Sequence, residues 1–517
     1  MPRWFNTAGP CKAELHYMLT AERRIPDVRQ LVEEQAYFVV HAPRQVGKTT
    51  SLLSLAQHLT VEGRFAAVLL SAEVGAPFGN DAGKAERAIV SSWRMSAEHW
   101  LPPELQPPAP SSDPVDGAHV KAMLSSWARA CPRPLVVFID EIDALYGEAL
   151  LSLLRQLRDG YSTRPRSFPW SLALVGLRDV RDYKVAAAGE GRLVTSSPFN
   201  IKVESLTLRD FTRDEVAELY GQHTADTGQA FETAAVDRAF ELTRGQPWLV
   251  NAMARQLVNV VVPGASRPIA PADVDSAKGI LIARQDTHLD SLTERLREPR
   301  VRRLIEPILA GTTLPDVPTD DVRYVCDLGL VRQRSDGGLE IANPIYAEVI
   351  PTSLAVVTRA SLPEIAPTWL RPHGRLDAQA LLDALLAFWR RHGEPLLGSA
   401  PYHEIAPHLV LMAFLHRVAN GGGALEREYA IGRGRMDLCL RYGPDVLAIE
   451  LKVWRDGEPD PKDEGLDQLD GYLAGLGLDA GWLVIFDRRA GVPRISERTA
   501  AAHEKTPSGR AVVVVRA

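Results

Sequence analysis

The sequence contains a loop whose residue types and spacing suit the binding of phosphate groups. Residues 42–50 read APRQVGKTT and lie between an apolar run at 37–41 and an amphipathic run at 51–59. A loop between a strand and a helix can hold phosphates with its backbone N–H groups and with the helix N-terminus. Lys48 would reach the terminal phosphates of a nucleotide, and the Thr49 hydroxyl would ligate Mg²⁺. The other loop positions expected to contact the nucleotide are Ala42, Gln45, Val46, Gly47 and Thr50.

Two acids that would serve the same chemistry follow the apolar run at 135–139. A buried strand in this run would carry Asp140 at its carboxyl end, with Glu141 next to it. There Asp140 would bind the nucleotide's Mg²⁺ through its water shell, and Glu141 would polarise an attacking water. The alternative is an acidic helix cap after a buried strand. The loop that contains Lys48 comes before these acids in the sequence, which is the order required if the loop and the acids act on one nucleotide. This order favours the catalytic role over a helix cap.

A third group of residues lies near the carboxyl end of the chain. Asp437 falls in one strand-like run, Glu450 and Lys452 fall in the next, and a turn at 443–445 joins the two runs. Residues two apart share a face of a strand, so Glu450 and Lys452 would point the same way. An antiparallel return over the turn would bring Asp437 beside Glu450. The alternative is a surface strand whose acid and lysine form a solvated pair.

Convergence of these three side chains would create a metal site suited to phosphodiester hydrolysis. The carboxylates of Asp437 and Glu450 are hard oxygen ligands of the kind that Mg²⁺ and Mn²⁺ prefer. A metal held in this way lowers the pKa of its bound water and offsets charge that develops on the phosphate. Lys452 would orient that water or stabilise the pentacovalent phosphorus.

The motifs APRQVGKTT and LVVFIDEID resemble those of the AAA-type and STAND-type P-loop ATPases, over roughly residues 25–350. The resemblance implies ATP and Mg²⁺ as cofactors, and it places Arg178 near the position of the sensor 1 residue. The turn TRGQP at 243–247 is similar to the GxP turn that opens the lid helix of the STAND group. Arg244 would then contact phosphate or, as the alternative, lie on the surface. Ala42 departs from the loop pattern, which has glycine at this position.

ATPases of this group usually place an arginine of a neighbouring subunit at the phosphate, so the resemblance also implies self-association into a homo-oligomer. Three arginines are candidates for such a finger, and for each one taken alone a structural role is the favoured alternative. They are Arg155, Arg158 and Arg164.

The motifs GRMD and ELK resemble the PD-(D/E)XK nuclease superfamily, over roughly residues 396–490. The resemblance implies that Glu404, on the preceding helix, completes the metal shell. It also implies a catalytic role for Gln468, which forms a QxxxY pattern with Tyr472. Met436 stands where the name of the superfamily has proline.

The fold class expected is α/β, with the parallel sheet of a P-loop NTPase, a helical lid, a winged-helix segment and a PD-(D/E)XK-like α/β domain at the carboxyl end. Strand-like runs that alternate with helix-like ones support the parallel sheet. The proline-rich stretch 101–114 predicts an exposed insertion. The predicted domains are an ATPase core (1–205), a lid (206–290), a winged-helix-like segment (291–350), a helical connector (351–395) and a nuclease-like domain (396–517).

Composition restricts the class of protein. The chain has 517 residues, of which 45% are hydrophobic and 24% charged, so a largely disordered chain is excluded. The four cysteines form no CxxC pair, and no apolar run approaches the roughly 18 residues of a membrane span. We therefore expect a cytoplasmic protein with no membrane partner. The net charge of −6 means that any contact with nucleic acid must come from a local patch.

These observations predict an ATP-binding and ATP-hydrolysing switch coupled to a metal-dependent nuclease, with DNA favoured over RNA as substrate. The resemblance suggests a role in prokaryotic defence or in mobile-element biology. One alternative is a regulatory ATP-binding protein whose carboxyl-terminal domain is an inactive nuclease relic used for recognition. A helicase-like motor is a further alternative, although no second motor core is evident.

Overall fold

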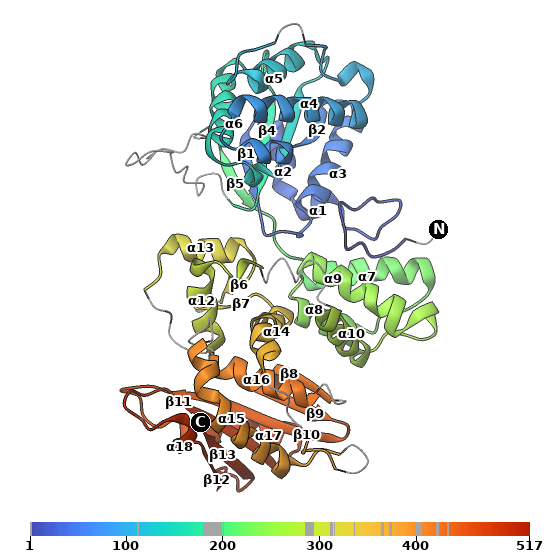
Figure 1. Cartoon of the computed structure of the whole chain (residues 1–517). Coiled ribbons are helices and arrows are strands. Elements are labelled where there is room, and N and C mark those ends of the chain that lie inside the picture. The colour runs from blue at the N-terminus through green and yellow to red at the C-terminus, as the bar shows by residue number, and fades with distance from the viewer. Residues whose placement is uncertain are drawn as a thin grey trace. The chain divides into compact units, whose positions relative to one another are not determined.

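The computed structural model describes the chain except for residues 1–2, 111–112, 179–198, 200, 285–293, 311–313, 315, 335–336, 363–366, 372–374, 400–405, 420–422 and 432–433. The chain divides into two compact units. Unit 1 comprises Met1–Arg284 and Thr319–Leu330, and unit 2 comprises Gln285–Pro318 and Val331–Ala517 (Figure 1).

A five-stranded parallel sheet forms the centre of unit 1, with the strand order β2-β3-β4-β1-β5. The strands β3 and β4 are buried along their whole length, as expected for apolar runs covered on both faces. In this order β4 lies between β1, which precedes the phosphate loop, and β3, which ends at Asp140. The strands are β1 (Tyr37–His41), β2 (Ala66–Ser71), β3 (Leu135–Asp140), β4 (Ser171–Gly176) and β5 (Glu204–Thr207).

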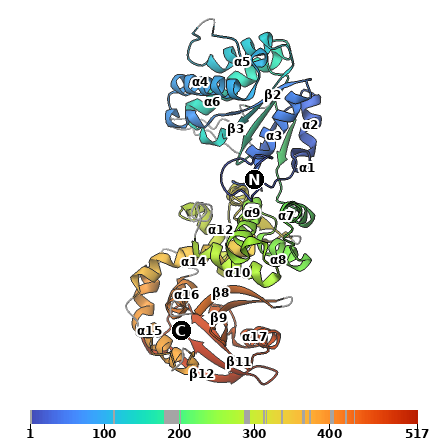
Figure 2. The same cartoon turned by 90° about the vertical axis from the view of Figure 1, so that its right-hand side faces the viewer.

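Helices cover both faces of this sheet (Figure 2). On one face, α2 and α3 pack leucine and valine side chains against Phe38 and Val40. On the other, α4, α5 and α6 surround Val137 and Ile139 with a core that includes two fully buried tryptophans. The helices are α1 (Ala21–Arg24), α2 (Pro26–Glu33), α3 (Lys48–Val61), α4 (Ala82–Trp100), α5 (His119–Ala130) and α6 (Gly147–Gly160).

The proline-rich stretch is not the wholly exposed insertion that its composition predicted. Leu101 and Leu105 are buried in the core, and Trp127 Nε1 donates a hydrogen bond of 2.8 Å to the Leu105 carbonyl. Prolines disfavour long helices and sheet ladders, but they leave apolar side chains between them free to fill a gap in the core. The other described residues of the stretch are exposed or half-buried, so the prediction missed only the two buried leucines.

Four helices follow the sheet in the range predicted as a lid, and their role as a lid stays a prediction. They are α7 (Arg213–Thr227), α8 (Thr233–Thr243), α9 (Pro247–Gln256) and α10 (Pro271–Arg284). α7 begins with a capping box in which Thr212 and Glu215 satisfy each other's backbone N–H groups. The amino-terminal segment packs on α7, where the rings of Phe5 and Tyr17 contact Tyr220 and His223. The helix α13 (Thr319–Asp327) also belongs to unit 1.

Unit 2 contains a six-stranded mixed sheet with the order β12-β13-β11-β10-β9-β8. The strands β10, β11 and β13 run parallel, while β8, β9 and β12 are antiparallel to their neighbours. The strands are β8 (Gly423–Ile431), β9 (Gly434–Tyr442), β10 (Asp445–Trp454), β11 (Ala480–Asp487), β12 (Ala500–Lys505) and β13 (Ala511–Arg516).

Different helices cover the two faces of the mixed sheet. Residues of α15 (Ala378–Ser399) and α16 (Ala406–Ala419) share a core with Leu438 and Ile449. Residues of α17 (Lys462–Leu476) share a second core with Cys439 and Ala448 on the opposite face. Much of α15 comes from the predicted connector 351–395, yet its apolar side chains pack into the core of the sheet.

The remaining elements of unit 2 are α12 (Pro299–Ala310), β6 (Val331–Gln333), β7 (Leu339–Ile341), α14 (Pro344–Ser361) and α18 (Ile495–Arg498). β6 and β7 pair in antiparallel fashion, with Val331 opposite Ile341. A winged-helix domain at 291–350 stays a prediction. Of the helices described, none combines the length and apolar composition needed to cross a membrane.

Candidate functional site

The phosphate loop connects β1 to α3 through two residues in the left-handed region of backbone space. Gly47 has φ +93°, a conformation that glycine adopts without strain, and Gln45 has φ +59°. α3 then begins at Lys48, and the Gly47 carbonyl accepts its first backbone hydrogen bond, from Ser51 N. Ala42 is not among the residues with positive φ. A methyl group is therefore unstrained where the resembled families have glycine.

Lys48 and Thr49 connect the loop to the end of β3. The Lys48 ammonium donates hydrogen bonds of 2.8 Å to the carbonyls of Ala42 and Pro43. Burial lowers the pKa of Lys48, although the nearby Asp140 carboxylate opposes that shift. The Thr49 hydroxyl donates a hydrogen bond of 2.6 Å to Asp140 Oδ2. The structure thus brings together the hydroxyl and the carboxylate that the sequence predicted as Mg²⁺ partners.

The two acids after β3 occupy different environments. Asp140 is only 4% exposed, and burial raises the pKa of its carboxyl despite the hydrogen bonds from Thr49 and from the Glu141 amide. Glu141 has φ +55°, and burial followed by the charges of Asp140 and Asp143 raises its pKa. Asp143 accepts a hydrogen bond of 3.1 Å from Leu177 N, which joins this turn to the end of β4. A cation would offset the repulsion among these acids.

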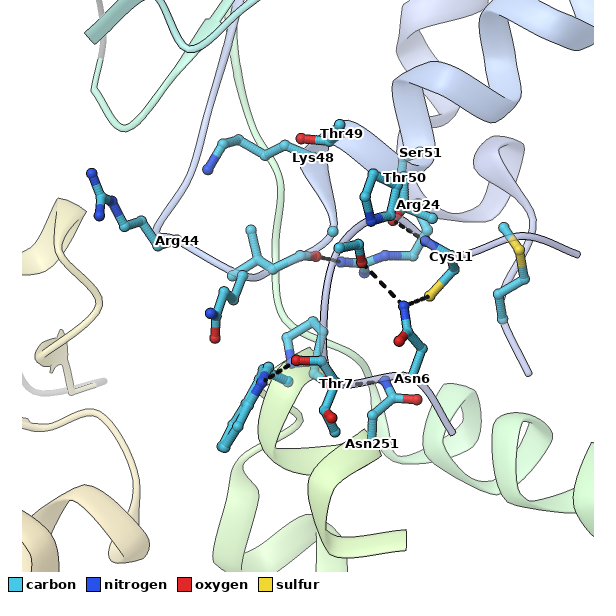
Figure 3. Close-up of a pocket in the computed structure, with 18 of the residues that line it drawn as sticks. Asn6, Thr7, Cys11, Arg24, Arg44, Lys48, Thr49, Thr50, Ser51 and Asn251 are labelled. Carbon is cyan, nitrogen blue, oxygen red and sulfur yellow. Dashed lines mark hydrogen bonds between the residues drawn. The ribbon is translucent and has the colours of Figure 1, made fainter. Parts of the chain in front are cut away.

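The loop and the acids line a cavity of about 420 Å³, part of which Figure 3 shows. Its wall includes the loop residues 44–51, Glu141 and Asp143. The helix α7 contributes Leu219, the helix α9 contributes three residues, and the loop before α7 contributes Phe211. The α9 residues are Pro247, Trp248 and Asn251. The volume is within the range of pockets that hold small ligands.

The amino-terminal segment forms part of this wall, which the sequence motifs did not predict. Residues 6–11 and 17–19 line the cavity, as does Arg24. Cys11 N donates a hydrogen bond of 3.0 Å to the Thr50 hydroxyl, and Trp248 Nε1 donates one of 2.9 Å to the Thr7 carbonyl. These residues carry no periodicity or motif that could have identified them, because their role depends on contacts with distant parts of the chain.

The predicted phosphate-contacting arginines do not line this cavity. The Arg178 guanidinium lies 4.6 Å from the centroid of the Tyr324 ring. Arg244 ends α8 with φ +51°, and Gly245 follows it with φ +79°. A Cβ atom on Gly245 would lie 1.9 Å from the Phe211 carbonyl oxygen, so this close turn requires glycine. The roles of Arg178 and Arg244 in phosphate binding stay predictions.

The three candidates for an arginine finger differ in their surroundings. Arg164 donates a hydrogen bond of 2.6 Å to the Gln35 carbonyl, and its guanidinium lies 3.6 Å from the Tyr161 ring centroid. These contacts give Arg164 a structural role within unit 1. Arg155 and Arg158 are exposed on α6.

The carboxyl-terminal candidates lie on the face of the mixed sheet that α17 covers. In the β9–β10 ladder Leu438 pairs with Ile449, which brings Asp437 next to the segment that contains Glu450. Asp437 Oδ2 accepts a hydrogen bond of 2.8 Å from Leu451 N. Lys452 Nζ lies 3.9 Å from Glu450 Oε1. The predicted convergence of two carboxylates and one ammonium group is therefore present.

Glu450 is 4% exposed, and none of the described residues forms a hydrogen bond with its Oε2 atom. Burial and the neighbouring Asp437 carboxylate raise the pKa of Glu450 to about 9, against the opposing charge of Lys452. A buried carboxylate oxygen without a donor, beside a second carboxylate, fits the coordination of a divalent cation.

Two side chains of α17 hold the Lys452 ammonium. Gln468 Oε1 accepts a hydrogen bond of 2.7 Å and Glu464 Oε1 accepts one of 2.8 Å. Gln468 was predicted at this site from its QxxxY pattern. Glu464 was not, although its position one helical turn before Gln468 was a usable signal.

Of the predicted metal ligands at this site, Asp437 and Glu450 lie in the described part of the chain. The predicted ligand Glu404 lies outside the described residues. Within the described part of the chain, no group of three or more His, Cys, Asp or Glu side chains is arranged to hold a metal ion.

Comparison with known proteins identifies the class of the amino-terminal domain. The family model described as "AAA domain" matches residues 31–183, which include the phosphate loop, β3 and the acids after it. These residues form an AAA-type P-loop ATPase domain. Curated proteins include no match to this chain.

Several solved structures are similar to the chain at low sequence identity. A Walker-type ATPase of Pyrococcus abyssi has 15% identity and a TM-score of 0.47, with 67% of this chain and 99% of that chain covered. Cdc6p of Pyrobaculum aerophilum has 14% identity and a TM-score of 0.38, with 69% and 97% covered. The RuvB Holliday junction branch migration motor of Thermotoga maritima has 15% identity and a TM-score of 0.34, with 62% and 90% covered.

Proposed function

We propose that this protein is an ATP-driven switch whose carboxyl-terminal domain is a metal-dependent nuclease that cleaves nucleic acid. The observation that carries the nuclease part is the meeting of Asp437, Glu450 and Lys452 on one face of the mixed sheet, with a buried oxygen of Glu450 left without a donor among the described residues. The AAA-type ATPase domain supplies the switch.

In the ATPase domain, Lys48 would exchange the loop carbonyls for the β and γ phosphates of ATP. Thr49 and Asp140 would hold Mg²⁺, which neutralises phosphate charge when it is bound. Glu141 follows Asp140 and has a raised pKa, so it would accept a proton from the attacking water.

In the carboxyl-terminal domain, Asp437 and Glu450 would hold Mg²⁺ or Mn²⁺, with Glu404 as a further ligand. The metal, when bound, supplies an activated water and charge stabilisation at phosphorus. Lys452 would stabilise negative charge on the phosphate oxygens, and Gln468 would fix the direction of the ammonium group.

The partners we propose are a nucleic acid, DNA before RNA, and further copies of the same chain. Arg155 and Arg158 are exposed on α6 and are available for contact with the phosphate site of a neighbouring subunit. We propose the cytoplasm as the compartment.

A cleavage assay tests the nuclease proposal. The purified full chain is incubated with plasmid DNA, single-stranded DNA and RNA, with Mg²⁺ or Mn²⁺, and with ATP, ADP or no nucleotide. We expect cleavage that falls at least about a hundredfold in Asp437→Ala and Lys452→Ala, because both remove charge stabilisation of the reacting phosphate. Glu458→Ala and Lys462→Ala remove exposed or half-buried charges of the same domain and should leave the rate within about threefold.

The alternative function is a regulatory ATP-binding protein whose carboxyl-terminal domain is an inactive nuclease relic used for recognition. Under that hypothesis the chain binds DNA but cuts neither DNA nor RNA with any metal or nucleotide. Lys48→Ala would then abolish ATP hydrolysis and alter DNA binding, while cleavage would be absent from both the wild-type chain and the variant.

A further inference from the structure

One side chain in the wall of the ATPase cavity has a polar atom that the protein leaves unused. Asn251 lies on α9, one helical turn after Pro247, and it lines the cavity while being only 8% exposed. Its Nδ2 atom donates a hydrogen bond of 2.8 Å to the Pro247 carbonyl. In the described part of the chain, no donor reaches Asn251 Oδ1.

The orientation of this amide follows from its hydrogen bond. A flipped amide would place Oδ1 against the Pro247 carbonyl oxygen, so that two acceptors would face each other. The amide oxygen is therefore the atom left for a ligand. A buried acceptor without a donor costs free energy, and a ligand that supplies a donor at this point recovers it.

Arg24 gives a second, independent sign that a polar ligand belongs in this cavity. It is 5% exposed, and its Nη2 atom donates hydrogen bonds to the carbonyls of Val46 and Arg209 at 3.1 and 2.8 Å. Its Nη1 atom has no acceptor among the described residues. A cavity with one unused acceptor and one unused cationic donor suits a ligand that carries both a hydrogen-bond donor and an anionic group.

Asn251 is far from the end of the cavity that binds phosphate. Figure 3 shows Lys48 and Thr49 well apart from Asn251, with Arg24 between them. Phosphates held by Lys48 would direct the base of a nucleotide away from the loop, toward the wall formed by the amino-terminal segment and α9. Asn251 thus lies on the side of the cavity where a base would be read.

We propose that Asn251 selects adenine by accepting a hydrogen bond from the 6-amino group of the base. This inference rests on the proposed ATP-dependent switch and names the residue that sets its nucleotide preference. Guanine and hypoxanthine carry an oxygen at position 6, which would face the Asn251 oxygen as a second acceptor. The cavity would bind these two bases weakly, because the oxygen at position 6 and the Asn251 oxygen would both stay without a hydrogen-bond donor.

The first test uses the wild-type chain and needs no substitution. Dissociation constants are measured for ATP, GTP, ITP and purine riboside triphosphate, which has no group at position 6. We expect ATP to bind roughly ten- to a hundredfold more tightly than the other three, because only ATP satisfies the buried acceptor. Equal affinity for ATP and purine riboside triphosphate would overturn the proposal.

The second test compares two substitutions on the same helix. Asn251→Leu removes the amide that lines the cavity. Gln256→Leu removes another buried amide of α9 whose Oε1 also has no partner in the described residues, but which does not line the cavity. Asn251→Leu should lower the affinity for ATP to the level at which the wild-type chain binds purine riboside triphosphate. The affinity of the variant for purine riboside triphosphate should stay within about threefold of the wild-type value. Gln256→Leu should keep the wild-type preference.

The outcomes separate this inference from the proposed function. If the wild-type chain binds no nucleoside triphosphate, the ATP switch itself is wrong. If it binds ATP selectively and Asn251→Leu keeps that selectivity, the switch stands and the role of Asn251 is wrong. If both substitutions abolish selectivity, the base preference depends on the packing of α9 and the assignment to Asn251 is also overturned.

Discussion

Thr49 Oγ1 lies 2.6 Å from Asp140 Oδ2, so the first turn of α3 is hydrogen-bonded to the carboxyl end of β3. The contact holds the two proposed Mg²⁺ partners together although β4 separates their strands in the sheet. Thr49 and Asp140 are the side chains that would hold the Mg²⁺ of a bound nucleotide.

Thr49→Val tests this relationship, because valine keeps the shape of threonine and removes the hydroxyl. We expect nucleotide affinity in the presence of Mg²⁺ to fall roughly ten- to a hundredfold, since one metal ligand is lost. In the presence of EDTA the affinity should change less than about threefold. Equal losses with and without Mg²⁺ would show that the hydroxyl does not act through the metal. Equilibrium titration of a fluorescent ATP analogue gives both values.

Glu141→Gln separates binding from hydrolysis. Glutamine cannot accept a proton from water, so we expect ATP hydrolysis to fall about a hundred- to a thousandfold while ATP affinity stays within about threefold. Phosphate release and nucleotide titration measure the two quantities. Glu148→Gln removes an exposed acid at the start of α6 and should change neither. Undiminished turnover in Glu141→Gln would assign the base to another group.

Alanine substitutions at two glycines with nearly the same φ angle distinguish the cost of a steric clash from the cost of backbone strain. Gly245 and Gly228 have φ +79° and +78°, but only at Gly245 would a Cβ meet another atom, the Phe211 carbonyl oxygen at 1.9 Å. Gly228→Ala should lower the free energy of unfolding of unit 1 by about 1 kcal/mol from strain alone. Gly245→Ala should cost about 3 kcal/mol or more and weaken ATP binding, because this turn positions α9. Urea unfolding and ATP titration compare the two, and equal losses would contradict the close approach.

Glu450→Gln tests the carboxyl-terminal site through stability and pH. The folded pKa of about 9 exceeds the ordinary value of 4.5. The folded state therefore binds one proton more than the unfolded chain between these values, and stability without metal falls as pH rises from about 4.5 to 9. Glutamine removes this titration, so the variant should be more stable than the wild type at pH 8, by roughly 1–3 kcal/mol.

The same variant should lose stabilisation by Mn²⁺, because it lacks the charged ligand. In the wild-type chain, Mn²⁺ affinity should increase with pH up to about 9, since the metal must displace the proton of Glu450. Thermal unfolding at pH 6 and pH 8, with and without Mn²⁺, measures both effects. A variant that Mn²⁺ stabilises as strongly as the wild type would exclude Glu450 as a ligand.

Strands whose side chains are buried on both faces were predicted well from sequence. The runs at 37–41 and 135–139 agree with β1 and β3 to within one residue, because burial on both faces demands continuous apolar residues. β5 and β12 were not predicted. Their side chains are mostly half-buried or exposed at the edges of their sheets, so their sequences carry little apolar pattern. β13 has an apolar run that could have indicated a strand.

The phosphate loop, the acids after β3 and the carboxylates of two neighbouring strands could be singled out from the sequence, because the residues of each group lie close along the chain. Folding in three dimensions was needed to show that the amino-terminal segment, Arg24 and Asn251 line the ATPase cavity, and that Glu464 holds Lys452. The residues that line the cavity come from segments far apart in the sequence, and the Glu464 contact joins a helix to the strand before it. These contacts depend on how helices and loops pack, and packing is not encoded in any short pattern of residues.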